Sequence, residues 1–444
     1  MSTSLAILRA AQQSPDRVAV VGDGYAHTWE QIADRTARVA GGLKDLGLAV
    51  GDRLAILAGN TAEHMEITHA AVWAGIVIVP INTRLSAVEV EAILRDCGAS
   101  AIACDEAHGA LARKASEATG IDMVIALSSD EAAPSLRALL QTEPIEPVCV
   151  PDDALLGLYY TGGTTGVAKG AMLTHKNLVA NLIQSNTFLG TAFDDLDQRG
   201  EQPVIMTALP MYHIFSFTVC GMFGLYRGCV VLLVPNPRDL DSLLKAYKAN
   251  PPAFFPAVNT LFNALANNEE FIAMDHSKLR QSMGGGMAVL SPTAEKWRQV
   301  TGNIIIQGYG LSETSPVATA NPSNSTTFTG TIGVPMPATD VAILDDAGNE
   351  VALGERGEIS VRGPQVMKGY WKRADASKEA FTADGEWFRT GDVAIIDEDG
   401  FVRIVDRIKD MILVSGFNVF PNEIEGVVAD KSKSKRKKDG VFYT

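Results

Sequence analysis

The most informative segment of the sequence reads Tyr160-Thr161-Gly162-Gly163-Thr164-Thr165-Gly166-Val167-Ala168-Lys169-Gly170, with four glycines, three threonines and one lysine. It follows the apolar run Leu155–Tyr159 and precedes a helical pattern that starts at His175. Glycines let backbone N–H groups approach phosphate oxygens closely, and the hydroxyls and the lysine add further donors. A flexible surface turn would rarely unite these residue types behind a buried strand. We therefore expect a phosphate-binding loop between a strand and a helix.

Two common nucleotide-binding motifs do not fit the sequence. A Walker A loop needs Gly-Lys-[Ser/Thr], whereas Val167 and Ala168 separate Gly166 from Lys169. The segment Gly308-Tyr309-Gly310-Leu311-Ser312-Glu313 carries a glutamate where a dinucleotide fingerprint has its third glycine. The loop is therefore neither a Walker A loop nor part of a dinucleotide-binding fingerprint.

The residues around the loop predict an α/β protein. Thr28 and Gln31 form a capping box at the start of a helix. Short apolar strands then alternate with helices, which is typical of βα units on a mainly parallel sheet. These elements are expected at Arg53–Leu57, Thr61–Ala74, Ile76–Ile81 and Val88–Cys97.

A second α/β stretch runs from Leu155 to about Asn321, and the pattern changes beyond it. Short strands separated by turn residues predict a small antiparallel sheet or barrel. They are expected at Val341–Leu344, Gly357–Val361 and Val393–Ile396.

The composition excludes several classes of protein. With 46% hydrophobic residues in 444, the chain can bury a large core, which excludes disorder over most of its length. The net charge of −14 argues against nucleic acid as a partner. Five cysteines without a CxxC pair indicate reduced thiols in a cytoplasmic protein, and the N-terminus lacks the features of a signal peptide. The apolar stretch Phe215–Pro235 is interrupted by Arg227 and predicts a core segment.

Several motifs, in this order and at large spacings, resemble the AMP-forming acyl-CoA synthetases of the adenylating superfamily, which includes acyl- and aryl-CoA ligases and luciferase. They are the phosphate loop, Gln307–Glu313, Thr390-Gly391-Asp392 and Asp406–Asp410. Bacterial long-chain fatty-acid–CoA ligases resemble the chain most, on the segments Tyr160–His175, Leu209–Phe215 and Met411–Glu425.

The resemblance implies an α/β fold with a large N-terminal adenylating domain at 1–405. This domain would contain two α/β subdomains and a small distorted β-barrel. A hinge and the start of a C-terminal lobe would occupy 406–429. The family's late glycine-lysine signature is absent, so we expect a truncated lobe with impaired catalysis. The lysine-rich tail at 430–444 is expected to be disordered.

The implied reaction is the ATP-dependent activation of a fatty acid to acyl-AMP and then acyl-CoA, with release of pyrophosphate and AMP. ATP, Mg²⁺ and coenzyme A would take part. Two alternatives stay open: a ligase for aryl acids of the hydroxycinnamate type, and a non-catalytic remnant that binds nucleotide or acyl-AMP. We expect a cytoplasmic protein with at most peripheral contact with the inner face of the membrane. A homodimer is compatible with the sequence.

The resemblance also assigns site residues. Catalysis is assigned to His213, Thr165, Lys169 and Glu313, with Glu313 as the magnesium ligand. ATP and AMP would contact Thr161, Gly162, Gly163, Thr164, Thr165, Gly166, Lys169, Gly285, Gly286, Gly308, Tyr309, Gly310, Ser312, Glu313, Asp392 and Arg407. The acyl group would contact His213, Phe215, Val258 and Met287, and the coenzyme A step would use Lys409, Ser415, Gly416 and Phe417.

Three of these residues also have a purely structural interpretation. Glu313 could be the N-terminal acid of a helix, Asp392 could cap a turn, and His213 could be a core histidine. Core packing accounts equally well for most of the apolar side chains assigned to the acyl group. Acyl chain length therefore cannot be deduced from the sequence.

Overall fold

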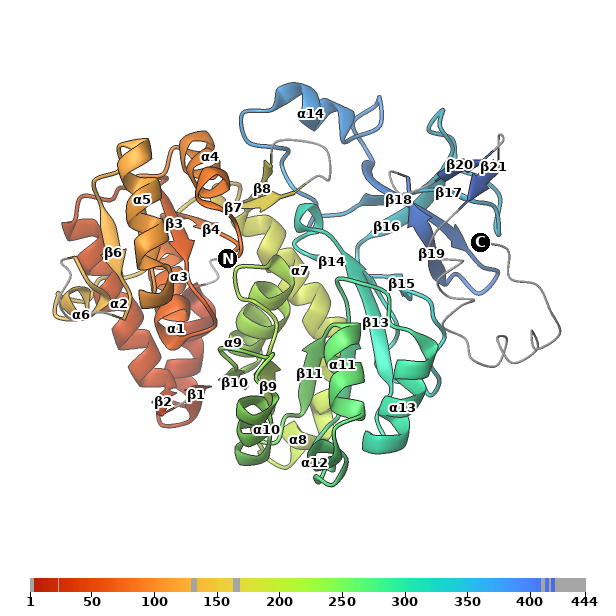
Figure 1. Cartoon of the computed structure of the whole chain (residues 1–444), viewed down its shortest axis with the longest axis horizontal. Coiled ribbons are helices and arrows are strands. Elements are labelled where there is room, and N and C mark those ends of the chain that lie inside the picture. Colours follow the sequence, from red (N-terminus) through yellow and green to blue (C-terminus); the bar gives the residue numbers. More distant parts are fainter. Residues whose placement is uncertain are drawn as a thin grey trace.

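The computed structural model describes residues 4–22, 24–128, 134–162 and 168–408, and the backbones of 412–414 and 417–419. These residues form two large sheets and a four-stranded sheet. Figure 1 shows the three parts side by side, with the red and orange N-terminal elements on the left and the blue C-terminal strands at upper right.

The first sheet has six strands in the order β6-β5-β3-β4-β7-β8. Neighbouring strands are parallel except for β8, which runs antiparallel to β7. Its parallel strands are short, apolar and mostly buried, as is typical of parallel sheets. The strands are β3 (Arg53–Leu57), β4 (Val77–Pro80), β5 (Ala101–Cys104), β6 (Val124–Ala126), β7 (Leu155–Thr161) and β8 (Lys169–Thr174).

In the chain, helices α2 (Trp29–Asp45) to α6 (Leu136–Leu139) precede or connect the strands β3 to β7 of this sheet. The predicted capping box is confirmed, because Thr28 accepts a hydrogen bond from the backbone of Gln31, whose side chain accepts one from the Thr28 N–H at 2.9 Å. Helix α2 packs against α3, and α4 packs against α5. The remaining bounds are α3 (Ala62–Trp73), α4 (Ala87–Cys97) and α5 (Gly109–Thr119).

The second sheet has nine strands in the order β15-β14-β13-β12-β11-β9-β10-β1-β2. The strands are β1 (Val18–Gly22), β2 (Tyr25–Thr28), β9 (Val204–Thr207), β10 (Val230–Leu233), β11 (Phe254–Ala257), β12 (Gln281–Gly284), β13 (Ile305–Gly310), β14 (Val317–Ala320) and β15 (Val334–Pro335). The helices outside the first sheet's α2–α6 group that precede the four-stranded sheet are α1 (Ser4–Gln13), α7 (His175–Leu189), α8 (Asp194–Gln198), α9 (Phe223–Arg227), α10 (Leu240–Ala249), α11 (Asn259–Ala266), α12 (Glu269–Ile272) and α13 (Ser291–Thr301).

The two sheets do not follow the order of the sequence. The phosphate-loop strands β7 and β8 belong to the first sheet, whereas the N-terminal hairpin β1-β2 joins the second. Strand β1 pairs in parallel with β10, where Val20 lies opposite Val231. The two sheets therefore do not coincide with the two α/β stretches of the sequence, because local patterns do not encode pairing between such distant segments.

The predicted antiparallel sheet beyond Asn321 is confirmed. It has the order β16-β17-β18-β19, with β16 (Asp340–Leu344), β17 (Gly357–Arg362), β18 (Phe388–Ile396) and β19 (Val402–Arg407). Helix α14 (Ala374–Glu379) precedes β18, and the short pair β20 (Ile412–Val414) and β21 (Phe417–Val419) follows. Strand β18 begins five residues before the predicted start. The prediction rested on apolar residues, and it missed the first half of the strand because that half contains the polar sequence Arg389–Asp392.

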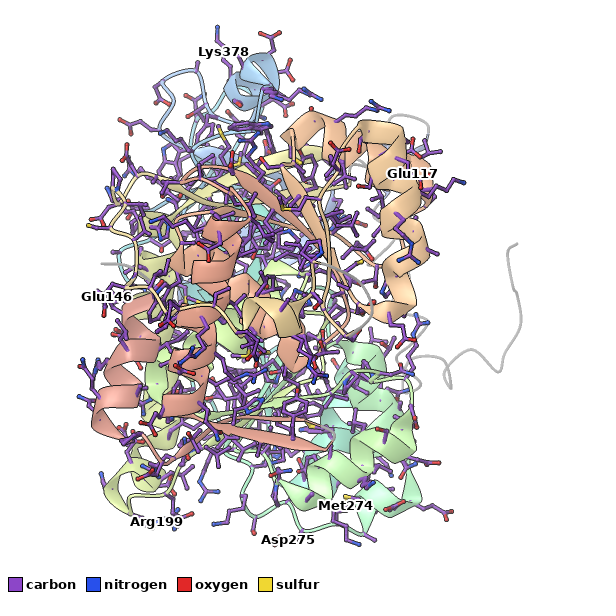
Figure 2. All side chains as sticks on the ribbon, turned by 90° about the vertical axis from the view of Figure 1, so that its left-hand side faces the viewer. Glu117, Glu146, Arg199, Met274, Asp275 and Lys378 are labelled. Atoms are coloured by element: carbon purple, nitrogen blue, oxygen red, sulfur yellow. The ribbon has the colours of Figure 1, made fainter. Side chains whose placement is uncertain are left out.

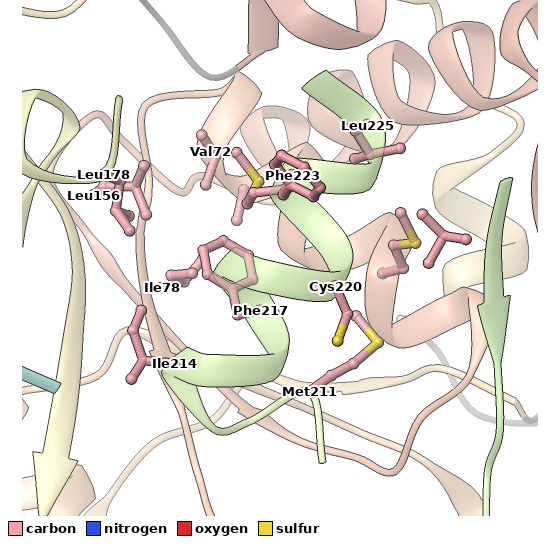
Figure 3. Close-up of a cluster of buried hydrophobic side chains, with 14 of the residues drawn as sticks. Val72, Ile78, Leu156, Leu178, Met211, Ile214, Phe217, Cys220, Phe223 and Leu225 are labelled. Atoms are coloured by element: carbon pink, nitrogen blue, oxygen red, sulfur yellow. The ribbon is translucent and has the colours of Figure 1, made fainter. Parts of the chain in front are cut away.

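The apolar stretch after Phe215 lies in the core, as predicted. Residues Ser216–Met222 form a π-helical segment in which every residue is buried, and α9 continues it. Figure 3 shows Phe217, Cys220 and Phe223 projecting from this segment among buried side chains such as Val72 and Ile78. In the described part of the chain, no helix is long and apolar enough to cross a membrane.

Charged side chains lie at the periphery. Figure 2 shows Glu117, Arg199, Asp275 and Lys378 at the edge of the molecule, where they are exposed. Glu66, Glu313, Glu358, Asp392 and Asp406 are exceptions, because these acidic residues are buried.

Candidate functional site

A cavity opens where the parallel strands of the second sheet end. Strand β12 ends at Gly284, strand β13 ends at Gly310, and the segment after β9 leads to His213. Open α/β sheets bind ligands at the carboxyl ends of their strands. The cavity is lined by His213, Ile214, Phe215, Met283, Gly285, Gly286, Gly308, Tyr309, Gly310, Leu311, Pro316 and Val317.

Seven of the predicted site residues therefore line one cavity, although they come from three separate segments. The glycines allow the walls to approach one another. A Cβ atom on Gly285 would lie 2.8 Å from the ring of Phe215, and one on Gly308 would lie 2.2 Å from the methyl group of Met283. Real Cβ atoms do not approach other atoms so closely, so a larger residue at either position would displace the Phe215 or Met283 side chain.

Tyr309, Asp392 and Arg407 form a connected group. The Tyr309 hydroxyl donates to Asp392 Oδ2 at 2.6 Å, and Arg407 Nε lies 3.5 Å from Asp392 Oδ1. Asp392 and Arg407 face each other on β18 and β19, which fixes their separation. Burial and the adjacent Asp392 carboxylate raise the pKa of Tyr309 well above its usual value, so its hydroxyl stays protonated. Asp392 is thus a side-chain acceptor held next to the cavity, rather than only a turn cap.

Glu313 lies in the short turn Ser312–Thr314 directly after the cavity residue Leu311. Its side chain is 6% exposed, and the Tyr370 hydroxyl donates to its Oε1 at 2.9 Å. The Thr161 hydroxyl lies 3.4 Å from the same oxygen, so the phosphate loop begins beside this carboxylate. Burial raises the pKa of Glu313, while both hydrogen bonds and the charge of Lys169 favour the ionised form. The Ser312–Thr314 turn is a single turn of 3-10 helix, and β14 begins at Val317, so Glu313 does not open a longer helix.

His213 lines the cavity instead of packing into the core. The Phe215 N–H donates to its Nδ1 at 3.3 Å, which leaves Nε2 to carry the proton of the neutral ring. His213 is exposed at the cavity wall, and partial desolvation there lowers its pKa, which favours the neutral imidazole. A neutral ring with its N–H directed away from the backbone can donate to an oxygen atom of a ligand.

Other predicted residues lie elsewhere or outside the described residues. Val258 lies beside the cavity, 4.0 Å from where a Cβ atom on Gly286 would be, but Met287 is 51% exposed and does not line it. The predictions for Gly163, Thr164, Thr165, Gly166, Lys409, Ser415 and Gly416, for the side chain of Phe417 and for the 430–444 tail concern residues outside the described structure.

Sequence reasoning missed two residues that hold the site together. Tyr370 contacts Glu313, and no spacing rule connects it with the phosphate loop. Asn60 follows β3 in the first sheet and is 4% exposed. Its side chain donates to the Leu209 carbonyl at 2.7 Å and accepts from the Met211 N–H at 2.7 Å. Asn60 thus fixes the segment that leads to His213, and only the fold reveals this contact.

Magnesium would have one protein ligand in this arrangement. Among the described residues, no three His, Cys, Asp or Glu side chains lie together as a metal site. Protein-bound Mg²⁺ commonly uses one or two carboxylates together with substrate phosphates. The single buried carboxylate of Glu313, next to Thr161, fits this mode of binding.

Comparison with known proteins identifies the family. A family model described as AMP-binding enzyme matches residues 7–371. A long-chain-fatty-acid–CoA ligase of Yersinia pestis is 42% identical, and the match covers 96% of this chain and 80% of that protein. A feruloyl-CoA synthase of Amycolatopsis is 35% identical, with coverages of 94% and 81%.

A solved structure shows the same fold. ATP-bound MatB from Rhodopseudomonas palustris matches with a TM-score of 0.86 at 28% identity, covering 97% of this chain and 84% of that one. The family model spans most of the chain, and the protein therefore belongs to the AMP-binding enzymes. The resemblance inferred from the motifs is confirmed.

Proposed function

We propose that the protein is an ATP- and Mg²⁺-dependent fatty acid–CoA ligase. In the first step a carboxylate oxygen attacks the α-phosphorus of ATP, and the bond to the departing pyrophosphate breaks. In the second step a coenzyme A thiol attacks the acyl carbon, loses its proton, and AMP leaves. The proposal is supported by the cavity residue Tyr309 with its partner Asp392, and by the Thr161–Glu313 contact that follows the cavity residue Leu311, in a chain 42% identical to a long-chain-fatty-acid–CoA ligase.

Each side chain has a distinct part in this proposal. Thr161 and Lys169 bind the triphosphate, Tyr309 stacks on the adenine, and Asp392 accepts hydrogen bonds from the ribose hydroxyls. The neutral His213 donates its Nε2 proton to the acyl carboxylate or to the α-phosphate and so holds the two reactants together. Glu313 would hold Mg²⁺, which when bound neutralises charge on the phosphate oxygens.

We also propose that residues 1–405 act as one adenylating domain and that 406–429 begin a second lobe. The four-stranded sheet ends with β19 at Arg407, two residues beyond the proposed boundary. The cytoplasm is the proposed location, since all five cysteines are free thiols, four of them buried.

The proposed function is tested with substrates of different shape. Pyrophosphate release and acyl-CoA formation are measured with decanoate, palmitate and coumarate in the presence of ATP, Mg²⁺ and coenzyme A. We expect the fatty acids to give both products. Turnover of coumarate alone would support the aryl-acid ligase, which the feruloyl-CoA synthase relative represents. ATP binding without pyrophosphate release would support a non-catalytic binding protein.

The proposed role of His213 gives a second expected result. His213→Ala should lower the rate of adenylate formation about 10–100-fold and leave the dissociation constant of ATP nearly unchanged. The reason is that its donor acts where the two reactants meet, not on the nucleotide alone. ATP-dependent pyrophosphate exchange and calorimetry measure the two quantities. An equal loss of ATP affinity and rate, together with a lower melting temperature, would favour a structural role.

A further inference from the structure

A short segment between β17 and α14 lies along the phosphate-loop hairpin, which is formed by β7 and β8. The Met172 N–H donates to the Gly369 carbonyl at 2.9 Å, the Lys368 N–H donates to the Met172 carbonyl at 3.0 Å, and the Trp371 N–H donates to the Gly170 carbonyl at 2.8 Å. Residues 368–371 therefore run antiparallel to β8 and extend the hairpin by one strand-like segment. We call residues 368–373 the bracing segment.

Tyr370 is the residue of the bracing segment that reaches the proposed catalytic groups. Its hydroxyl donates to Glu313 Oε1 at 2.9 Å, and Lys169 Nζ lies 5.1 Å from the centre of its ring. A cation this close to the face of an aromatic ring is attracted to it. Burial, followed by the Glu313 carboxylate, raises the pKa of Tyr370 well above its usual value, which keeps the hydroxyl a donor. The Tyr370 side chain thus contacts both Lys169 of the phosphate loop and the carboxylate of Glu313, the proposed magnesium ligand.

The bracing segment is anchored at its far end by Asp96, which is the last but one residue of α4. Arg373 Nη2 donates to Asp96 Oδ1 at 2.7 Å, and Tyr160 donates to Asp96 Oδ2 at 2.7 Å. The Trp371 indole N–H donates to the Asp96 carbonyl at 3.1 Å. Tyr160 directly precedes Thr161, so one carboxylate fixes both the start of the phosphate loop and the bracing segment. This double attachment restricts how far Tyr370 can move.

We propose that Tyr370 is a positioning residue of the adenylating site. Its hydroxyl holds the Glu313 carboxylate in one orientation, in which Glu313 would bind the Mg²⁺ of MgATP, and its ring holds Lys169 beside the phosphate loop. A buried carboxylate that lacked this donor would be held less firmly in that orientation. The inference rests on the proposed function, since it concerns the metal ligand and the phosphate loop of that site.

The two contacts of Tyr370 can be tested separately by calorimetry of ATP binding, with Mg²⁺ or with EDTA. Tyr370→Phe removes the hydroxyl and keeps the ring, so it should weaken ATP binding about tenfold with Mg²⁺ and less than twofold with EDTA. Tyr370→Leu also removes the ring from Lys169 and should weaken ATP binding under both conditions. Each variant is compared with the wild type at the same pH and ionic strength.

Tyr247→Phe is the matched control. The Tyr247 hydroxyl is also buried and hydrogen-bonded, to His276 Nδ1 at 2.9 Å, but it lies away from the cavity. This variant should lower the melting temperature and leave both ATP affinities unchanged. If Tyr370→Phe does not fold, Asp96→Asn replaces it, because weakening the anchor should reduce the Mg²⁺-dependent part of the affinity.

The outcomes separate this inference from the proposed function. Wild-type protein that binds no ATP would remove the proposed function itself. If the wild type binds MgATP and Tyr370→Phe binds it equally well, Tyr370 has no positioning role. Equal weakening with Mg²⁺ and with EDTA would also overturn the inference, because the hydroxyl would then act through the fold and not through the metal ligand.

Discussion

Glu313→Gln should lower kcat/KM for adenylate formation by about 10²–10³-fold. The substitution keeps the size of the side chain and an oxygen that can accept the Tyr370 hydroxyl, but it removes the charge that would bind Mg²⁺. Without that charge the ion on the phosphates loses its protein ligand, and the negative charge of the departing pyrophosphate is neutralised less well. Pyrophosphate release at saturating and at limiting Mg²⁺ measures the effect.

The fold should tolerate this substitution. An ionised carboxylate that is 6% exposed costs free energy of desolvation, which a neutral amide largely avoids. We therefore expect the melting temperature of Glu313→Gln to equal or exceed that of the wild type. Reduced activity at unchanged or higher stability would show that Glu313 is retained for function.

Glu66→Gln is the matched control for Glu313→Gln. The Glu66 carboxylate is also buried, at 2% exposure, and accepts bonds from Arg35 Nε at 2.6 Å and Nη2 at 2.9 Å. Loss of this ion pair should lower the stability and leave the Mg²⁺ dependence of the reaction unchanged. If Glu313→Gln keeps its full rate at limiting Mg²⁺, the carboxylate does not bind the metal.

Local elements could be predicted from the sequence because their determinants are close together in it. Strand Arg53–Leu57 has the predicted limits, which follow from the apolar run Leu54–Leu57, and the next helix begins at His175 as predicted. The assignment of strands to sheets could not be predicted in the same way. Strand β1 pairs with β10, and this choice depends on packing between segments that are far apart in the chain.

The candidate site was predictable where its residues belong to recognisable motifs. His213, Tyr309 and Gly285 come from separate segments, and the fold brings them to one cavity. Tyr370 and Asn60 act through side-chain contacts across the fold, for which the sequence has no periodic or spacing signal. Met287 shows the opposite error, since an apolar residue next to a glycine run is exposed rather than in the cavity.

Gly310→Ala should damage both the fold and the reaction. A Cβ atom at this position would lie 1.9 Å from the Pro316 carbonyl oxygen and 2.6 Å from the Pro316 carbonyl carbon. Both are backbone atoms, so the new methyl group fits only if the turn between β13 and β14 moves. That turn carries Glu313, and a displacement of about 1 Å in a reacting group can lower a rate about 10²-fold. We expect this loss in kcat/KM, together with about 1–3 kcal/mol of lost stability from overpacking.

Gly120→Ala separates the effect of the displaced turn from that of a strained backbone. Gly120 caps α5 with a φ of 73°, and a Cβ atom there would meet nothing within 4 Å. The left-handed conformation costs about 1–2 kcal/mol for alanine, so this control should lose comparable stability and keep its full activity. The two variants are compared by urea unfolding and by pyrophosphate release at a temperature where both are folded. If Gly310→Ala loses stability but not rate, the position of the turn does not govern Glu313. The close contact with Pro316 would then serve only the packing of the two strands.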